Sequence, residues 1–378
     1  MAEADDGKVF AGDEMTSRQR LLATYRRQPT DRIPYWAKVT NGNWRRAQPQ
    51  RVRDWSDREL LDYIHADGIF GSPRCVAAEA PRVSTERLDD GRGGWTLVTR
   101  TPDGEMTERW AHDAATGTHH PVEFPVKTVQ DLKRYRWLYE GRTCRTSDEE
   151  VARSRQRRDE VGRRGITLTG WGTSPLMHLI EHVLGQEQTV YFLADWPEET
   201  AELIGLMHRA NCQMVRRVAA SSAADVIVSV ENTSTTLLSP ALFERFCRAH
   251  LIDYGRIIEA AGKMHELHMC GLLLALLERI DGIPAASMEA FTCPPLGNTR
   301  LADGRAKAPS KALIGGTCVN VWWRQAPEQI ERFIAGELDA CRDHRGIVVT
   351  TAGVAPQACT AETFRAVGQW LATVEPKT

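Results

Sequence analysis

The sequence predicts an α/β protein, a (β/α)8 barrel that carries an N-terminal extension and a β-hairpin insert. From residue 166 onward, apolar runs of strand length alternate with amphipathic stretches of helix length. This alternation implies parallel strands joined by helical crossovers. A doubly wound sheet would carry a glycine-rich turn after its first strand, and the sequence has none there. The 378 residues are a length that α/β barrels reach as one domain.

The N-terminal part divides into an arm, a helix and a strand. Residues 1–15 are acidic, and we expect them to form a disordered arm ahead of a single barrel domain at 16–378. A helix is predicted from Ser17 to Arg27 with Thr16 as its N-cap, and a strand from Ile33 to Val39. Between about 80 and 150, short alternating runs broken by Asp-Gly pairs predict the β-hairpin insert.

The regular part begins after the insert. Predicted helix starts are Asp195 before Pro197, Ser239 before Pro240, and Thr360, because these side chains cap helices and proline favours the first turn. The predicted strands are Ile166–Thr169, Val226–Val230, His265–His268, Ala286–Met288, Ala312–Ile314 and Ile347–Thr350.

Composition excludes several classes of protein. The net charge is −2, so nothing suggests a nucleic-acid partner bound through its phosphates. No run of 18 apolar residues predicts a membrane span, and the acidic N-terminus does not resemble a signal peptide. We therefore expect a cytoplasmic protein whose nine cysteines stay reduced and serve as packing residues or ligands.

In a barrel, chemistry belongs to residues just after the carboxyl ends of strands. His268 and Cys270 stand at one such end, and side chains two residues apart in an extended segment point the same way. Glu289 and Cys318 follow the next two strands. Zinc favours mixed nitrogen and sulfur ligands, so we predict a metal site at these ends. The alternative is that Cys270 is a small packing residue and His268 a core histidine.

Other strand ends indicate a pocket. Glu231 and Asn232 follow a strongly apolar strand, and we predict catalytic roles for them, the alternative being a loop or cap hydrogen bond. Trp171 and Trp322 are predicted to form an aromatic wall that binds a flat cofactor, the alternative being core packing.

Several segments together resemble one superfamily. The run Met15-Thr-Ser-Arg-Gln-Arg-Leu21 leading to Asp31-Arg-Ile-Pro34 is similar to the opening of the uroporphyrinogen decarboxylase superfamily. So are Leu238-Ser-Pro240 before a long helix, and the strand end His268-Met-Cys-Gly271. The resemblance spans about residues 15 to 372 and is loosest in the insert. It implies a (β/α)8 barrel.

The superfamily has two branches that differ in chemistry. True uroporphyrinogen decarboxylases carry an arginine-rich Met-Arg-Gln-Ala-Gly-Arg motif after the first strand and use no metal. Here that place reads Trp36-Ala-Lys-Val-Thr-Asn-Gly-Asn-Trp-Arg-Arg46, which lacks the motif. The other branch contains cobalamin-dependent methyltransferases with His-x-Cys on a strand end and a zinc ion. The resemblance to this branch implies zinc bound by His268 and Cys270.

The sequence departs from the methyltransferase pattern at the last strand. That branch usually has a further cysteine there, whereas this chain reads Thr350-Thr-Ala-Gly-Val354. Cys318 or Glu289 is expected to complete the ligand set, with Cys293 as a weaker candidate.

The predicted function is a zinc-dependent methyltransferase. It would move a methyl group between a corrinoid such as methylcobalamin and a thiol or other small acceptor, or take it from a methyl ether. The chain has no Asp-x-His-x-x-Gly motif of its own, so the corrinoid would come from a separate protein or as free cofactor. A small-molecule substrate and a homodimer are the other expected partners. The alternatives are a metal-free lyase acting on a small carboxylated substrate, and a non-catalytic binding barrel.

Overall fold

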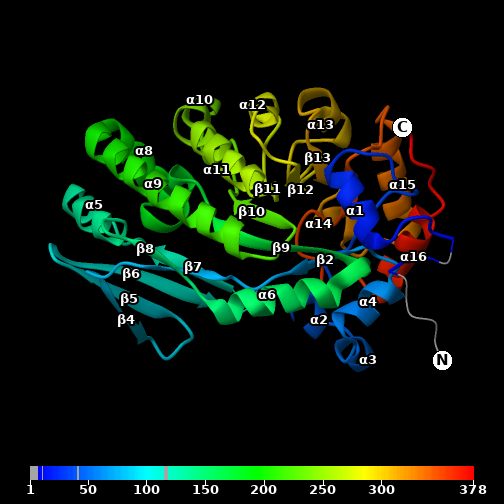
Figure 1. Ribbon diagram of the computed structural model, residues 1–378, viewed down its shortest axis with the longest axis horizontal. Coiled ribbons are helices and arrows are strands. Elements are labelled where there is room, and N and C mark those ends of the chain that lie inside the picture. The colour runs from blue at the N-terminus through cyan, green and yellow to red at the C-terminus, as the bar shows by residue number, and fades with distance from the viewer. Residues whose placement is uncertain (1–6, 11, 41, 115–117) are drawn as a thin grey trace.

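The computed structural model describes residues 7–10, 12–40, 42–114 and 118–378, and it contains an eight-stranded parallel sheet (Figure 1). The strand order is β1-β14-β13-β12-β11-β10-β9-β2, so each strand from β9 to β14 pairs with the next along the chain. Helices surround the strands on the outside. The predicted (β/α)8 barrel is confirmed. Its strands are β1 Tyr35–Trp36, β2 Gly68–Gly71, β9 Gly165–Gly172, β10 Val226–Val230, β11 Met264–His268, β12 Ser287–Phe291, β13 Ala312–Gly315 and β14 Ile347–Thr350.

The helices follow the predicted rhythm. They are α1 Ser17–Tyr25, α2 Gly42–Arg46, α3 Gln50–Arg53, α4 Asp57–Tyr63, α5 Val129–Tyr135, α6 Asp148–Val161, α7 Pro175–His178, α8 Gln186–Asp195, α9 Pro197–Ser221, α10 Pro240–Phe243, α11 Ala249–Ala260, α12 Leu277–Asp281, α13 Leu301–Lys307, α14 Val319–Trp322, α15 Pro327–Asp339 and α16 Ala361–Leu371. Within the described residues, none of them is long and apolar enough to cross a membrane.

Several predicted helix starts are confirmed by side-chain caps. Thr16, Ser239 and Thr360 each accept a hydrogen bond from a backbone N–H of the first turn. The prediction for Asp195 is wrong, because this residue ends α8 and the N-cap position of α9 falls to Trp196, which makes no side-chain cap bond.

An apolar cluster fills one end of the barrel interior, next to the buried Glu266, which accepts a hydrogen bond from Tyr25. Six residues from five strands pack there with Leu21 and Tyr25 of α1, namely Ile69, Ile166, Val226, Val228, Ile314 and Val348. Helix α1 therefore covers the amino end of the barrel and leaves the carboxyl end for chemistry.

Asp67 joins the first and second strands of the barrel. Its backbone N–H donates to the carbonyl of Tyr35 at 2.6 Å, and its carboxylate accepts from the N–H of Tyr35 at 3.1 Å. Arg20 and Arg32 form ion pairs with the same buried carboxylate at 2.7 and 3.0 Å. The ends of the sheet are thus tied through one side chain.

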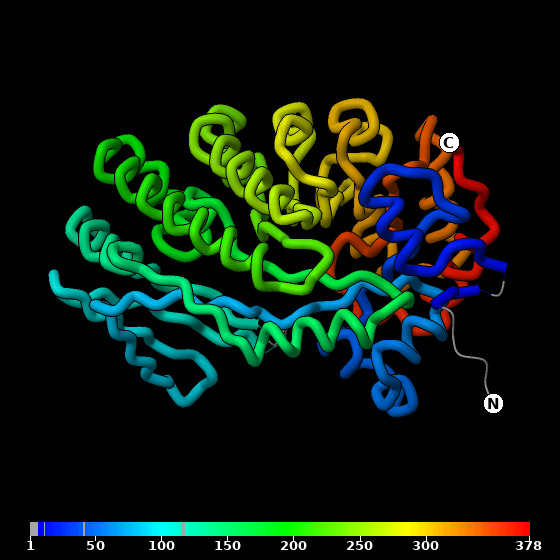
Figure 2. Tube along the Cα trace, in the orientation of Figure 1, coloured from blue at the N-terminus to red at the C-terminus, as the bar shows by residue number. Residues whose placement is uncertain are grey.

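The insert is a separate antiparallel layer, as predicted. A ribbon of β3 Val76–Glu79 and β8 Thr143–Thr146 leads to a four-stranded sheet, β4 Ser84–Asp89, β5 Trp95–Thr101, β6 Gly104–Asp113 and β7 Thr118–Glu123. The sheet projects from the barrel at the end of the long axis opposite α1 and α16 (Figure 2).

The predicted disordered arm falls partly outside the described residues, which omit 1–6 and 11. Its described part packs on the barrel. Asp13 pairs with Arg20 and Arg32, and the Phe10 ring stacks on His65 with centroids 4.6 Å apart.

Candidate active site

A charged cluster lies across the mouth of the barrel, at the carboxyl ends of the strands. Glu289 of β12 accepts a hydrogen bond from Lys38, which follows β1, on one carboxylate oxygen. Its other oxygen contacts Nδ1 of His268, the last residue of β11. Glu289 is buried, whereas His268 and Lys38 are half-buried. One carboxylate therefore holds two cationic side chains from different strands.

These contacts fix the charges of the cluster. Burial alone would raise the pKa of Glu289, but Lys38 and His268 lower it to about 2. Burial alone would lower the pKa of His268, but contacts with Cys270 and Glu289 raise it to about 10. Both groups are therefore ionised at neutral pH in the structure as it stands.

The Cys270 thiol is the exposed member of the site. Its side chain contacts the imidazole of His268, and its Sγ donates to Oδ1 of Asn232 at 3.4 Å. Asn232 adopts the left-handed conformation with φ of 46°, and the N–H groups of Glu231 and Asn232 both bond to the carbonyl of His268. The ends of β10 and β11 are locked together in this way.

Glu181 joins the site from outside the strands. It lies on the π-helical turn Leu179–Val183, and its side chain contacts Asn232 close to the charge of His268. Burial raises the pKa of Glu181, and the contact with Asn232 and the charge of His268 partly oppose this rise. Single π-turns within helices occur often at functional sites.

Glu231 is fully buried and its carboxylate is satisfied by protein groups. It accepts from the N–H and Oγ of Ser174 at 2.5 and 2.7 Å, and from Thr173 at 3.2 Å. Burial raises the pKa of Glu231 to about 7, against these hydrogen bonds. The structure shows an anchor between the ends of β9 and β10, and the catalytic role stays a prediction.

The predicted tryptophans have different surroundings. Trp171 is nearly buried, packs edge-on against Tyr254 and donates its Nε1–H to Ser229, yet it borders a cavity. Trp322 is fully buried, donates to Thr317 and stacks on Phe364. We assign Trp322 to the core, because its ring offers no surface to a ligand.

The four predicted metal ligands do not form one cluster. Cys318 is buried, donates to the carbonyl of Pro294 at 3.7 Å and contacts Cys293, whose hydrogen bond lowers the pKa of Cys318. Both oxygens of Glu289 are taken by Lys38 and His268. Within the part of the chain that the structure describes, no group of three or more His, Cys, Asp or Glu residues could hold a metal ion.

A smaller donor set remains. His268 and Cys270 supply an imidazole nitrogen and a thiol in contact with one another, which are donors that zinc prefers. The carboxylate on Nδ1 of His268 is the partner that metal-bound histidines usually have. These two residues fit zinc, whereas Cys318 and Glu289 do not fit as further ligands.

The sequence did not single out Glu181 as a functional residue, and it gave Lys38 no role. Lys38 had one usable signal, its place just after the first strand. Glu181 lies within a helix, where no spacing pattern marks it.

Comparison with known proteins places this site in a family. The profile described as "Uroporphyrinogen decarboxylase (URO-D)" matches residues 116–367, two thirds of the chain, so the chain belongs to this family. No curated protein sequence matches the chain.

Two solved structures align with the chain. A methyltransferase from Methanosarcina mazei aligns with a TM-score of 0.61 and 14% identity, over 95% of this chain and 98% of that one. A B12-independent methionine synthase from Shewanella sp. W3-18-1 aligns with a TM-score of 0.43 and 10% identity, covering 83% of this chain and 84% of that one. At these identities the likeness concerns the fold alone.

Proposed function

We propose that this protein is a methyltransferase whose site binds zinc through His268 and Cys270. The observation that carries the proposal is the exposed Cys270 thiol in contact with an imidazole that a buried carboxylate orients. The fold shared with a methyltransferase agrees with it. The methyl group would pass between a corrinoid held by a separate protein and a small thiol or ether.

The side chains around the pair have separate tasks. Glu289 and Lys38 hold the His268 ring through Nδ1 and leave its Nε2 for a ligand. Glu181, beside Asn232, places a further carboxylate close to the charge of His268. Bound zinc would hold an acceptor thiol as the thiolate, the form that attacks a methyl carbon.

The barrel supplies position, which is a large part of the rate of such a displacement. Hydrogen bonds from the N–H groups of Glu231 and Asn232 to the carbonyl of His268 fix the two loops that would carry the acceptor. An acceptor bound there would face the open mouth of the barrel, where a corrinoid protein could dock.

The test combines metal content and turnover. We expect about one zinc per chain in the wild type and loss of zinc in Cys270→Ala and His268→Ala. Cys318→Ser, the control, should keep its zinc. Methylcobalamin and a small thiol should react with the wild type and not with Cys270→Ala. Equal zinc in the wild type and Cys270→Ala would contradict the proposal.

A second candidate is a metal-free lyase, favoured by one observation. Lys38, Glu289 and His268 form a charged chain that is complete without an ion. Loss of carbon dioxide leaves a carbanion that must gain a proton, and a His268 with a pKa raised to about 10 by its contacts is a proton donor. Purified protein without zinc that releases carbon dioxide from a small carboxylate would favour this candidate.

A further inference from the structure

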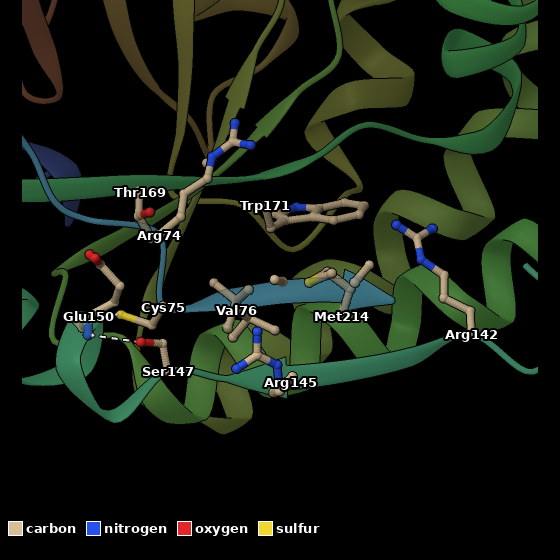
Figure 3. A pocket seen from close by; sticks show the side chains of 14 residues that line it. Arg74, Cys75, Val76, Arg142, Arg145, Ser147, Glu150, Thr169, Trp171 and Met214 are labelled. Carbon is tan, nitrogen blue, oxygen red and sulfur yellow. Dashed lines mark hydrogen bonds between the residues drawn. The ribbon is translucent and has the colours of Figure 1, made fainter. Parts of the chain in front are cut away.

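We propose that a cavity beside the barrel mouth binds the acidic end of the substrate, an apolar molecule that carries carboxylate or phosphate groups. The cavity measures about 500 Å³, within the range of small-molecule sites. It lies where the ribbon β3–β8 of the insert meets β9 and α9 (Figure 3). As a statement about substrate, the inference rests on the proposed function, and anion binding itself can be measured separately.

The charge of the cavity is positive. Arg74, Arg142 and Arg145 line it, and Glu150 is the acidic residue among its lining. Glu150 pairs with Arg153 at 2.7 Å, outside the lining. Glu150 therefore forms no ion pair with any of the three lining arginines.

The arginines differ in their partners. Among the described residues, no carboxylate pairs with Arg74 or with Arg142, whose guanidinium lies over the Tyr139 ring at 4.9 Å. Arg145 pairs with Glu79 at 2.6 Å, but both side chains are exposed. Arginine binds carboxylate and phosphate through paired hydrogen bonds, so this set matches an anion with more than one acidic group.

Much of the remaining lining of the cavity is apolar. Val76, Met214 and Val218 line it, and Trp171 projects from β9 between Arg74 and Arg142 in Figure 3. The indole N–H is already donated to Ser229 at 2.7 Å, so the ring presents carbon to a ligand. The ligand therefore needs an apolar body as well as acidic groups.

The cavity and the proposed metal ligands share one rim. Arg74 follows β2. A Cβ added at Gly170 of β9 would lie 4.0 Å from the guanidinium of Arg74 and 3.7 Å from the side chain of Val230 of β10. Val230 is paired in register with His268 of β11. The guanidinium of Arg74 and the side chain of His268 are therefore two strand spacings apart, a distance of about 10 Å. A substrate whose acidic group lies about that far from its reacting atom can fill both places.

Titration calorimetry of the full-length protein tests the binding. The probes are pyrophosphate and propane-1,2,3-tricarboxylate, which separate phosphate from carboxylate recognition. We expect at least one probe to bind, and the Kd to rise at least about tenfold in the double variant Arg74→Gln/Arg142→Gln. Arg256→Gln, an exposed arginine on α11, is the matched control and should leave the Kd unchanged.

The outcomes separate this proposal from the proposed function. His268→Ala should lose zinc but keep anion binding. Binding of neither probe at millimolar concentration, or equal binding by the wild type and the double variant, would overturn the inference whatever the zinc content. Preference for one probe would name the acidic group of the substrate.

Discussion

Glu289 shares its two carboxylate oxygens between Lys38 and His268, and this arrangement decides which nitrogen of His268 is free. A histidine whose Nδ1 is held by a carboxylate presents Nε2 in a fixed direction. Glu289 therefore acts through His268 instead of binding an ion directly. Glu289 was predicted as a direct metal ligand, and its contacts instead favour a role in orienting His268.

The first prediction concerns this orienting role. Glu289→Gln should weaken zinc binding by about 10- to 100-fold, because the amide holds Nδ1 less strongly and Lys38 loses its ion pair. Competition with a chelator measures the affinity. Glu328→Gln, in the exposed first turn of α15, is the control and should bind zinc as the wild type does. Unchanged affinity in Glu289→Gln would be inconsistent with the role.

The second prediction concerns the substrate of the family profile. Uroporphyrinogen III should not be decarboxylated, because the arginine-rich motif after the first strand is missing. The described residues at that place include Lys38, which is already engaged by Glu289, and Arg45, which pairs with Asp57 at 2.6 Å. Arginine is the side chain suited to binding carboxylates in pairs. Chromatography that detected a coproporphyrinogen product would refute this.

Spacing in the sequence predicted one part of the site and missed another. His268 and Cys270 lie two residues apart on a strand end, so a periodicity argument brings them together. Glu181 and Lys38 reach the site through the three-dimensional closure of the barrel, which spacing does not encode. Cys318 was misplaced for the same reason: its strand end is adjacent, but its side chain turns to Cys293 and Pro294.

At the scale of elements, the loop after β11 depends on Gly271. Its φ is 139°, and an added Cβ would lie 2.7 Å from the side chain of Ser234. This close approach sets the course of the chain just after Cys270. The loop also bonds back to the β10 loop through the N–H of Leu272 and the hydroxyl of Ser234.

The third prediction follows from this loop. Gly271→Ala should destabilise the protein by about 1–3 kcal/mol and lower its zinc content, because both the backbone and Ser234 must shift. Urea unfolding measures the free energy. Gly336→Ala, in the exposed middle of α15 with open space around it, should be neutral or stabilising by up to about 1 kcal/mol. Equal stability of the Gly271 variant and the wild type would contradict the argument.

Strands that consist of strongly apolar runs can be predicted from the sequence, whereas short strands of mixed composition cannot. β10 and β14 match their predicted bounds, since each is a mostly β-branched, apolar run of typical buried-strand character. β2 consists of the four residues Gly-Ile-Phe-Gly. Glycine is not typical of strand interiors, so the sequence did not predict this strand. β1 is shorter than predicted because pairing is limited to Tyr35 and Trp36.

At the scale of the whole molecule, Asp67 bridges β1 and β2, the two end strands of the sheet. Asp67 bonds to the backbone of Tyr35 and holds Arg20 and Arg32, so α1, β1 and β2 meet at one buried carboxylate. The ribbon of the insert supplies one wall of the arginine-lined cavity, so the insert contributes to the proposed anion site. Stability and ligand binding are therefore assigned to opposite ends of the barrel.

The last prediction is the acid sensitivity of this closure. Burial would raise the pKa of Asp67, but Arg32 and Arg20 lower it to about 2, from an ordinary value of 3.8. A carboxylate with a lowered folded pKa stabilises the protein above its unfolded pKa, and that stability is lost as pH falls through the folded pKa. Asp67 should thus contribute on the order of 2 kcal/mol at neutral pH, lost between about pH 4 and 2.

Urea unfolding across acidic pH measures this contribution. Asp67→Asn should lower stability at neutral pH, on the order of 2–3 kcal/mol, because two buried arginines each lose one of their carboxylate partners while keeping Asp13. It should also lose part of the acid dependence, whereas the exposed control Asp159→Asn should keep all of it. If Asp67→Asn does not fold, the wild type still decides. Its free energy of unfolding must fall as pH drops below about 4, and a flat profile there would refute closure through an ionised Asp67.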